Sequence, residues 1–275
     1  AVGYEALKSN TTGTNNVASG YQALNLNTTG YNNTAVGYSA LYSNTTGSSN
    51  VAYGYGALYS NTTAGSLTAV GAQALNANTT GTSNSAFGYQ ALKANTTGTS
   101  NTALGYNSLT ANTTGTWNTS VGAAALQSNT TGGYNAAVGD YNLSANTTGS
   151  GNIAVGQRAL QQNTVGLYNV AAGYVALQSN TWGQSNIAIG LGGLQSNVGG
   201  FANVSVGSYS LHSNTYGNYS VAIGYEALKV STASNLVAVG WAALKFNTTG
   251  EKNTAIGKEA LYQNTTGAQN TASGY

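Results

Sequence analysis

The sequence predicts an all-β protein, a repetitive parallel β-solenoid, or β-roll, of about sixteen 17-residue coils. Three observations predict this fold: a glycine that recurs with a constant 17-residue period, a leucine at the fourth position after it, and a short segment rich in Val, Ile and Thr before it. Self-similarity at a short fixed period is typical of solenoid proteins. Because parallel strands stack at a constant spacing, we expect every residue to lie above its own copy in the preceding coil.

The recurring glycine, here called the anchor glycine, starts at Gly3 and repeats once in every 17-residue coil. One interval, from Gly224 to Gly240, is a single residue shorter than the others and places a shortened coil at 230–235. We interpret residues 1–275 as a single continuous repeat array. Because the chain starts and finishes inside the same motif, we expect it to be a fragment of a longer fibre.

The residues just before each anchor glycine predict a short β-strand. They place Val, Ile or Thr on both sides of an alanine, as in Ile187-Ala188-Ile189, and β-branched residues are typical of strands. Both faces of this strand are apolar, with Val36 and Val70 on one face and the Ala and Gly columns on the other, which predicts that both are covered. We expect one face to fill the interior, and the small-residue face to let another copy of the chain approach closely.

The leucine after each anchor glycine predicts the core. It recurs in sixteen coils without a substitution, which indicates a buried position, and we expect it on a short second strand. One buried leucine contributes about 1.5 to 3 kcal/mol, whereas ordering the backbone costs about 1 to 2 kcal/mol for every residue. Neighbouring coils must therefore share a core. The predicted core leucines are Leu7, Leu24, Leu41, Leu58, Leu75, Leu92, Leu109, Leu126, Leu143, Leu160, Leu177, Leu194, Leu211, Leu228, Leu244 and Leu261.

The recurring Asn-Thr-Thr-Gly segment predicts a turn, because Asn and Gly tolerate positive φ. The same triplet matches the N-glycosylation sequon, so turn chemistry and glycan attachment both stay open. Coils about 4.8 Å apart would crowd bulky glycans on every turn, and we favour turn chemistry. The candidate glycosylation sites are Asn10, Asn27, Asn44, Asn61, Asn78, Asn95, Asn112, Asn129, Asn146, Asn247 and Asn264.

The composition excludes several classes of function. Only 4% of the residues are charged, and the net charge of +2 is spread along the chain, which predicts no nucleic-acid partner. The chain has one histidine, His212, no cysteine and no clustered acids, which predicts no catalytic site, no metal site and no cofactor. No apolar run approaches the length of a membrane span. We expect a structural protein rather than an enzyme.

Three strand segments carry a resemblance to known proteins. Residues 186–190 (Asn-Ile-Ala-Ile-Gly), 203–207 (Asn-Val-Ser-Val-Gly) and 220–224 (Ser-Val-Ala-Ile-Gly) resemble the head repeats of trimeric autotransporter adhesins, the YadA-like family. The array also looks like those of bacterial and phage tail-fibre-like proteins. The resemblance implies a left-handed β-roll, three chains wide, that serves in adhesion or as a spacer. The expected location is extracellular, on a cell or virion surface, and the expected partner is the chain itself, as a homotrimer.

Aromatic and hydroxyl columns leave two alternatives open. A tyrosine follows many anchor glycines, from Tyr4 and Tyr21 onward, and a stacked column of such rings either binds sugars or stabilises neighbouring coils. Aligned threonines raise the further alternative of an ice-binding solenoid. The two threonines of each turn are adjacent, however, and adjacent residues of an extended chain point in opposite directions. We therefore favour the structural interpretation of both columns.

The turns change between Asn163 and Asn214. Apolar residues there replace the usual second threonine, at Val165, Trp182 and Tyr216. An exposed apolar patch is typical of a docking site, although drift in a tolerant turn explains the same pattern. We call these three residues the turn patch.

Overall fold

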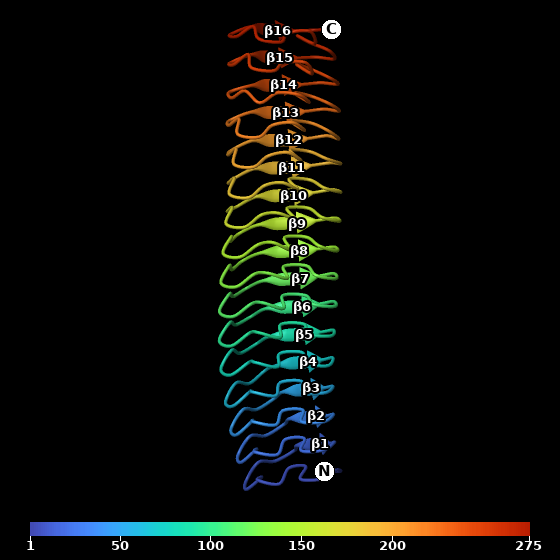
Figure 1. Ribbon diagram of the computed structural model, residues 1–275, viewed down its shortest axis with the longest axis vertical. Coiled ribbons are helices and arrows are strands. Elements are labelled where there is room, and N and C mark those ends of the chain that lie inside the picture. Colours follow the sequence, from blue (N-terminus) through green and yellow to red (C-terminus); the bar gives the residue numbers. More distant parts are fainter. The chain divides into compact units, whose positions relative to one another are not determined.

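The computed structural model describes residues 1–275 and divides into two compact units, Ala1–Asn135 and Ala136–Tyr275. The chain is all-β, with sixteen three-residue strands and no helix. Within each unit the strands stack in chain order as a parallel sheet (Figure 1). The prediction of a parallel β-solenoid with 17-residue coils is therefore confirmed.

The strands recur at the repeat period in both units. The strands of the first unit are β1 (Val17–Ser19), β2 (Thr34–Val36), β3 (Val51–Tyr53), β4 (Thr68–Val70), β5 (Ser85–Phe87), β6 (Thr102–Leu104) and β7 (Thr119–Val121). Those of the second unit are β8 (Ala136–Val138), β9 (Ile153–Val155), β10 (Val170–Ala172), β11 (Ile187–Ile189), β12 (Val204–Val206), β13 (Val221–Ile223), β14 (Val237–Val239), β15 (Thr254–Ile256) and β16 (Thr271–Ser273).

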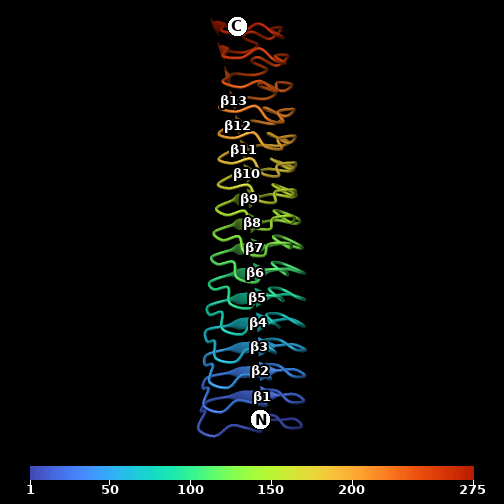
Figure 2. The same cartoon turned by 60° about the vertical axis from the view of Figure 1, so that its left-hand side comes forward.

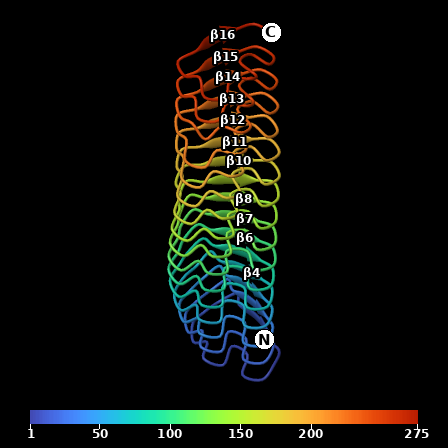
Figure 3. The same cartoon turned by 45° about the horizontal axis from the view of Figure 1, so that its top comes forward.

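Each strand residue pairs with its own copy in the next coil. Ala18 pairs with Ala35 in the first unit, and Ala171 pairs with Ala188 in the second. Figures 2 and 3 show that successive coils of a unit follow the same path and carry the strand at the same place. Residues with the same place in the repeat therefore form columns that run from coil to coil.

The leucine segment is a turn, and the second strand that the sequence predicts is absent. Leu41 has a φ of 51° and Leu58 a φ of 53°, in the left-handed region that L residues other than Asn and Asp rarely adopt. A strand would require extended backbone at these positions. The leucine N–H instead donates to an alanine carbonyl of the next coil, as from Leu41 to Ala57 at 2.9 Å. Hydrogen bonding between coils thus holds leucine in a conformation that its own propensity disfavours.

The interior of a coil is thin, and the side chains that point into it are the small ones that the sequence predicts to lie outside. Ala154 at the centre of β9 is fully buried, whereas its neighbours Ile153 and Val155 lie outward. Ser108 and Ser120 replace alanines on the two sides of the interior, and their hydroxyl oxygens are 2.7 Å apart. This separation leaves room only for small side chains. The small-residue face is therefore the inner one, and the aliphatic face is the one available to another chain.

The leucine column fills the rest of the interior. Every leucine of the column from Leu24 to Leu244 is fully buried. Leu7 and Leu261, in the first and last coils that the structure describes, are half-buried. Within each unit the apolar core is thus a row of leucines packed against two rows of alanines.

The anchor glycine is required at its corner for two reasons. Gly20 has a φ of +138°, a conformation that residues with a side chain avoid. A Cβ atom at Gly20 would also lie 2.4 Å from the carbonyl oxygen of Gly37 in the next coil. The backbones of successive coils therefore approach at this corner as closely as they can.

The shortened coil keeps the strands in register. Ala222 of β13 pairs with Ala238 of β14, so the missing residue is absorbed outside the sheet. Ser231 stands where other coils have the first asparagine of the turn, and its buried hydroxyl accepts a hydrogen bond from Asn247 at 3.2 Å. The deletion predicted at 230–235 is therefore confined to the turn.

Candidate functional site

The outward strand face consists of the residues on either side of each buried strand alanine. None of these residues is charged in any of the sixteen strands. Ile189, for example, exposes 45% of its surface although it is a strand residue. The exposed large apolar members of the face are Val17, Val51, Tyr53, Phe87, Leu104, Val138, Ile153, Val155, Ile187, Ile189, Ile223 and Ile256. Exposed apolar side chains, interspersed with Thr and Ser, therefore recur on this face within each unit.

The asparagines of the Asn-Thr-Thr turns point into the protein and form a ladder. Asn44 donates from its side-chain nitrogen to the side-chain oxygen of Asn27 at 2.8 Å and to the carbonyl oxygen of Gly47 at 2.9 Å. Asn61 in turn donates to the side-chain oxygen of Asn44 at 2.9 Å. Neither the asparagine nor the glycine of this turn has positive φ, so the turn is formed by side-chain hydrogen bonds and not by the backbone property that the sequence suggests.

This ladder favours turn chemistry over glycan attachment at the sequon. An N-linked glycan would be attached to the side-chain nitrogen, and at Asn44 both hydrogens of that nitrogen are already donated within a fully buried site. The sequon asparagines from Asn27 to Asn146, together with Asn247, are all fully buried. Only Asn10 and Asn264, in the first and last coils, are partly exposed. The folded coils therefore support turn chemistry and disagree with glycosylation at the interior positions.

A second asparagine column lies just before the strands and was not singled out by sequence reasoning. Asn50 accepts a hydrogen bond from the backbone N–H of Leu67 at 3.0 Å and itself donates to the carbonyl oxygen of Ala64 at 2.9 Å. Asn101 and Asn118 make the same kind of contact in later coils and are fully buried. An exposed turn accepts several polar residue types, whereas this position is nearly always Asn. That restriction is the sequence signal that could have revealed a buried, hydrogen-bonded column.

The tyrosines after the anchor glycines stack on one another. The ring centroids of Tyr4 and Tyr21 are 5.2 Å apart, those of Tyr21 and Tyr38 are 5.0 Å apart, and those of Tyr38 and Tyr55 are 5.4 Å apart. A second column follows the buried leucine, where Tyr42 and Tyr59 stack at 5.2 Å. The stacking supports a structural role for the rings along these coils.

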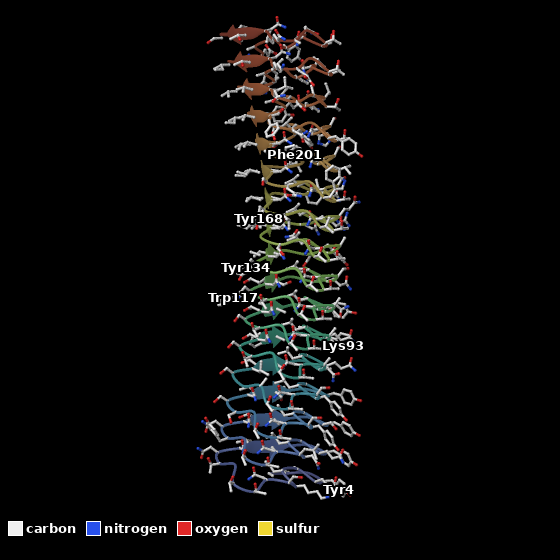
Figure 4. All side chains as sticks on the ribbon, turned by 90° about the vertical axis from the view of Figure 1, so that its left-hand side faces the viewer. Tyr4, Lys93, Trp117, Tyr134, Tyr168 and Phe201 are labelled. Atoms are coloured by element: carbon white, nitrogen blue, oxygen red, sulfur yellow. The ribbon has the colours of Figure 1, made fainter.

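A hollow of about 410 Å³ opens between these two tyrosine columns in the first unit. We call it the Tyr groove. Its lining residues are Gln22, Tyr38, Ser39, Tyr42, Tyr55, Gly56, Tyr59, Gln73 and Asn76. Figure 4 shows that Tyr4 and Lys93, which belong to the same two columns, project from one side of the first unit, while Trp117 and Tyr134 project from the opposite side.

The turn patch lies on the second unit, and two of its three residues lie close together. The rings of Trp182 and Tyr216 are 6.3 Å apart, and Val165 exposes 46% of its surface. The indole of Trp182 covers Gly199, where a Cβ atom would lie 2.0 Å from the ring. Beside it is a hollow of about 350 Å³, whose aromatic lining comes from Trp182, Phe201 and Tyr219, without Val165 or Tyr216. Sequence reasoning therefore found the tryptophan but missed its two aromatic neighbours.

The two threonines of each turn have different surroundings. The Thr28 hydroxyl donates to the carbonyl oxygen of Thr45 in the next coil at 3.0 Å, whereas Thr29 is exposed. One threonine of each pair therefore belongs to the hydrogen-bonded framework. The two-column hydroxyl face that an ice-binding surface would use is not formed by this turn.

Charged residues gather in one ion-pair cluster of the second unit. Glu226 lies 2.5 Å from the Lys229 ammonium and 2.7 Å from that of Lys245. Hydrogen bonds from Lys229 and then Lys245 hold the pKa of the Glu226 carboxyl below its ordinary value. The hydrogen bond to Glu226 raises the pKa of Lys245. This cluster joins two coils across the shortened turn.

The remaining candidate chemistry is sparse. His212 lies against the carbonyl oxygen of Gly192 at 3.0 Å and edge-on to the ring of Tyr209. The chain holds no group of three or more His, Cys, Asp or Glu side chains placed to bind a metal ion. It also forms no helix of the length and apolarity that crossing a membrane requires. A scan against protein-family models and a search of curated proteins found no match to this chain.

Proposed function

We propose that the chain is the structural shaft of an extracellular fibre and that it self-associates through the outward strand face. The observation that carries this proposal is a strand face that holds no charged residue in any strand and exposes apolar side chains in both units. Exposed apolar patches of this extent mark interaction sites, and depletion of charge is typical of the buried centre of an interface. A flat face that repeats with the coil matches a second copy of itself, coil for coil.

The internal hydrogen bonding supports a mechanical role. The strand pairs, the asparagine ladder and the leucine N–H groups all bond one coil to the next, so that each coil is held by its neighbours. Stability in such a protein is a sum of coil and nearest-neighbour terms, and the array can be extended without redesign. A protein built on this plan serves as a spacer whose length is set by the number of coils.

The homotrimer and the adhesin-like or tail-fibre-like setting rest on the resemblance of the strand segments. Three copies placed with their outward strand faces together would cover the aliphatic columns of every copy. The same arrangement leaves the tyrosine columns and the Asn-Thr-Thr turns outside the contact. On a cell or virion surface such a shaft would hold an attached domain away from the body that carries it.

The test is the molecular mass of the purified chain in solution, measured by sedimentation velocity and native mass spectrometry. We expect three copies of the 27.6 kDa chain. The double variant Ile187→Lys, Ile189→Lys puts charge on the outward strand face without touching the interior, and we expect it to be monomeric with an unchanged circular dichroism spectrum. The control, Thr97→Lys with Thr148→Lys, adds the same charge at two exposed turns and should stay oligomeric. A monomeric parent chain, or a double lysine variant that still assembles, would overturn the proposal.

A further inference from the structure

The Tyr groove exists because one side chain is missing from the column between the two rows of tyrosines. This column carries Gln22, Ser39, Gly56 and Gln73 in successive coils, so that the two glutamines close the ends and Gly56 leaves the middle open. The other glycine of the column, Gly192, makes no such hollow. A Cβ atom there would lie 3.2 Å from the ring of Tyr209, which already occupies the space.

The first run of stacked tyrosines in each column also ends at this groove. Tyr55 stacks on Tyr38, and Tyr59 stacks on Tyr42, but the next coil has Ala72 and Asn76 in their places. The last ring of each column is therefore not stacked by a further aromatic side chain. Tyr55 exposes 58% of its surface and Tyr59 exposes 39%. The groove thus offers aromatic carbon surface on two sides.

The groove contains polar atoms that are free to bind a ligand. Asn76 uses its side-chain nitrogen to bond the carbonyl oxygen of Gly56 at 2.8 Å, and its side-chain oxygen accepts no hydrogen bond. Gln73 accepts from Gln90 at 2.8 Å through its oxygen, and its nitrogen donates to no group of the chain. The Ser39 hydroxyl likewise makes no hydrogen bond. A donor, an acceptor and a hydroxyl are therefore available within one recess that contains no charged residue.

We propose that the Tyr groove binds neutral carbohydrate. A pyranose ring has an apolar C–H surface that packs on tyrosine and neighbouring hydroxyls that both donate and accept, which suits the amides of Gln73 and Asn76. A purely apolar ligand would leave these amides without partners, and an ionic ligand would find no opposite charge in the groove. The volume lies within the range of about 300 to 1,000 Å³ that is usual for small-molecule sites.

This site does not depend on the proposed fibre. The Tyr groove shares no residue with the outward strand face, so self-association through that face leaves the groove open. A carbohydrate site on the side of a shaft would add adhesion to a spacer. Either property can fail without the other, because one is measured by chain mass and the other by ligand binding.

The experiment uses the full chain and isothermal titration calorimetry with cellohexaose, maltohexaose and, as an anionic probe, sialyllactose. We expect one of the two neutral hexasaccharides to bind at concentrations below about 10 mM and the anionic probe not to bind. Gly56→Gln refills the column with one of its two commonest residues, and the φ of 59° at Gly56 equals that of Gln73. The added Cβ atom would lie 3.2 Å from the side-chain nitrogen of Asn76, a small overlap that this flexible amide can relieve, so the fold should be kept. We expect this variant to weaken binding by about tenfold or more, because the side chain occupies the recess.

Two further variants keep the test specific. Asn107→Gln places glutamine in the same column outside the groove and should bind as the parent chain does. Tyr59→Ala removes one wall and should weaken binding severalfold, while Tyr262→Ala, in the same column of the second unit, should not. Absence of binding by both neutral hexasaccharides, binding of the anionic probe alone, or a Gly56→Gln variant that binds as tightly as the parent would each overturn the proposal.

Discussion

The side-chain nitrogen of Asn95 lies 2.8 Å from the side-chain oxygen of Asn78, and both side chains are fully buried in consecutive coils. Amide groups cost free energy when they are buried without partners. Here each amide is bonded to its own copy, so a single residue type repeated in register satisfies the whole column. The interior of this solenoid therefore contains a hydrogen-bonded column of amides in addition to its leucines.

Replacing Asn95 by alanine should destabilise the protein strongly. The change removes the bonds of Asn95 to Asn78 and Gly98 and leaves Asn112 with one of its two acceptors, the carbonyl oxygen of Gly115. We expect a loss of about 2 to 4 kcal/mol in the free energy of unfolding, measured by urea denaturation. Asn264→Ala is the control, because that side chain is partly exposed in the last coil, and it should cost less than about 1 kcal/mol. A loss for Asn95→Ala as small as that expected for the control would show that the ladder contributes little.

The leucine column should respond according to its place in the array. Leu109→Ala removes a fully buried side chain between two coils and should cost about 2 to 5 kcal/mol. Leu261→Ala, in the half-buried last coil, should cost less than half as much. The comparison is made by thermal and urea unfolding of both variants. A larger loss at Leu261 would contradict a core that is shared between neighbouring coils.

The paired serines of the interior should be coupled. The Ser108 and Ser120 hydroxyls bond each other at 2.7 Å where other coils have two alanines. Ser108→Ala or Ser120→Ala alone should cost about 1 kcal/mol, because the remaining hydroxyl loses a partner. The double alanine variant should recover most of that loss, since it recreates the pairing found in neighbouring coils. Additive losses in this double-mutant cycle would show that the two hydroxyls act independently.

The ion-pair cluster should make stability depend on pH in acid. The pKa of Glu226 is lowered in the folded protein, so its contribution is fully present above the unfolded value of about 4.3 and is lost as the pH falls through the folded value. Glu226→Gln should lower stability at pH 7 by about 1 kcal/mol and make little difference once the pH is well below 4. Unfolding free energies of both proteins across this range supply the check. A constant difference down to pH 2 would rule out titration of Glu226 as the cause.

The fold was predictable because the 17-residue period is carried by residue types that only a stack of coils accommodates. An anchor glycine in every coil and an unbroken leucine column require stacked coils, and the structure places both as columns. The handedness implied by the resemblance stays a prediction. The local conformation was not predictable in the same way. The repeat pattern predicts a strand at Leu41, but hydrogen bonds to the next coil hold this residue at positive φ.

The surfaces were less predictable than the fold. The orientation of Ala154 and Ile153 depends on the thickness of the interior, which no single coil reveals. The sequon at Asn44 reads the same whether its side-chain amide points into the protein or out to solvent. The stacking of the coils determines that it points inward. The Tyr groove depends on the missing side chain of Gly56, which the repeat pattern presents as ordinary variation.

The most direct test of the account is high-resolution electron cryomicroscopy of the native assembly, in which the chains around the axis are counted and the covered face is identified. We expect three chains whose outward strand faces meet, with the tyrosine columns exposed and no non-protein density at the Asn-Thr-Thr turns. A single chain, or an assembly in which Ile187 and Ile189 face solvent, would contradict self-association through the strand face. Non-protein density on the interior turns would contradict the buried asparagine ladder.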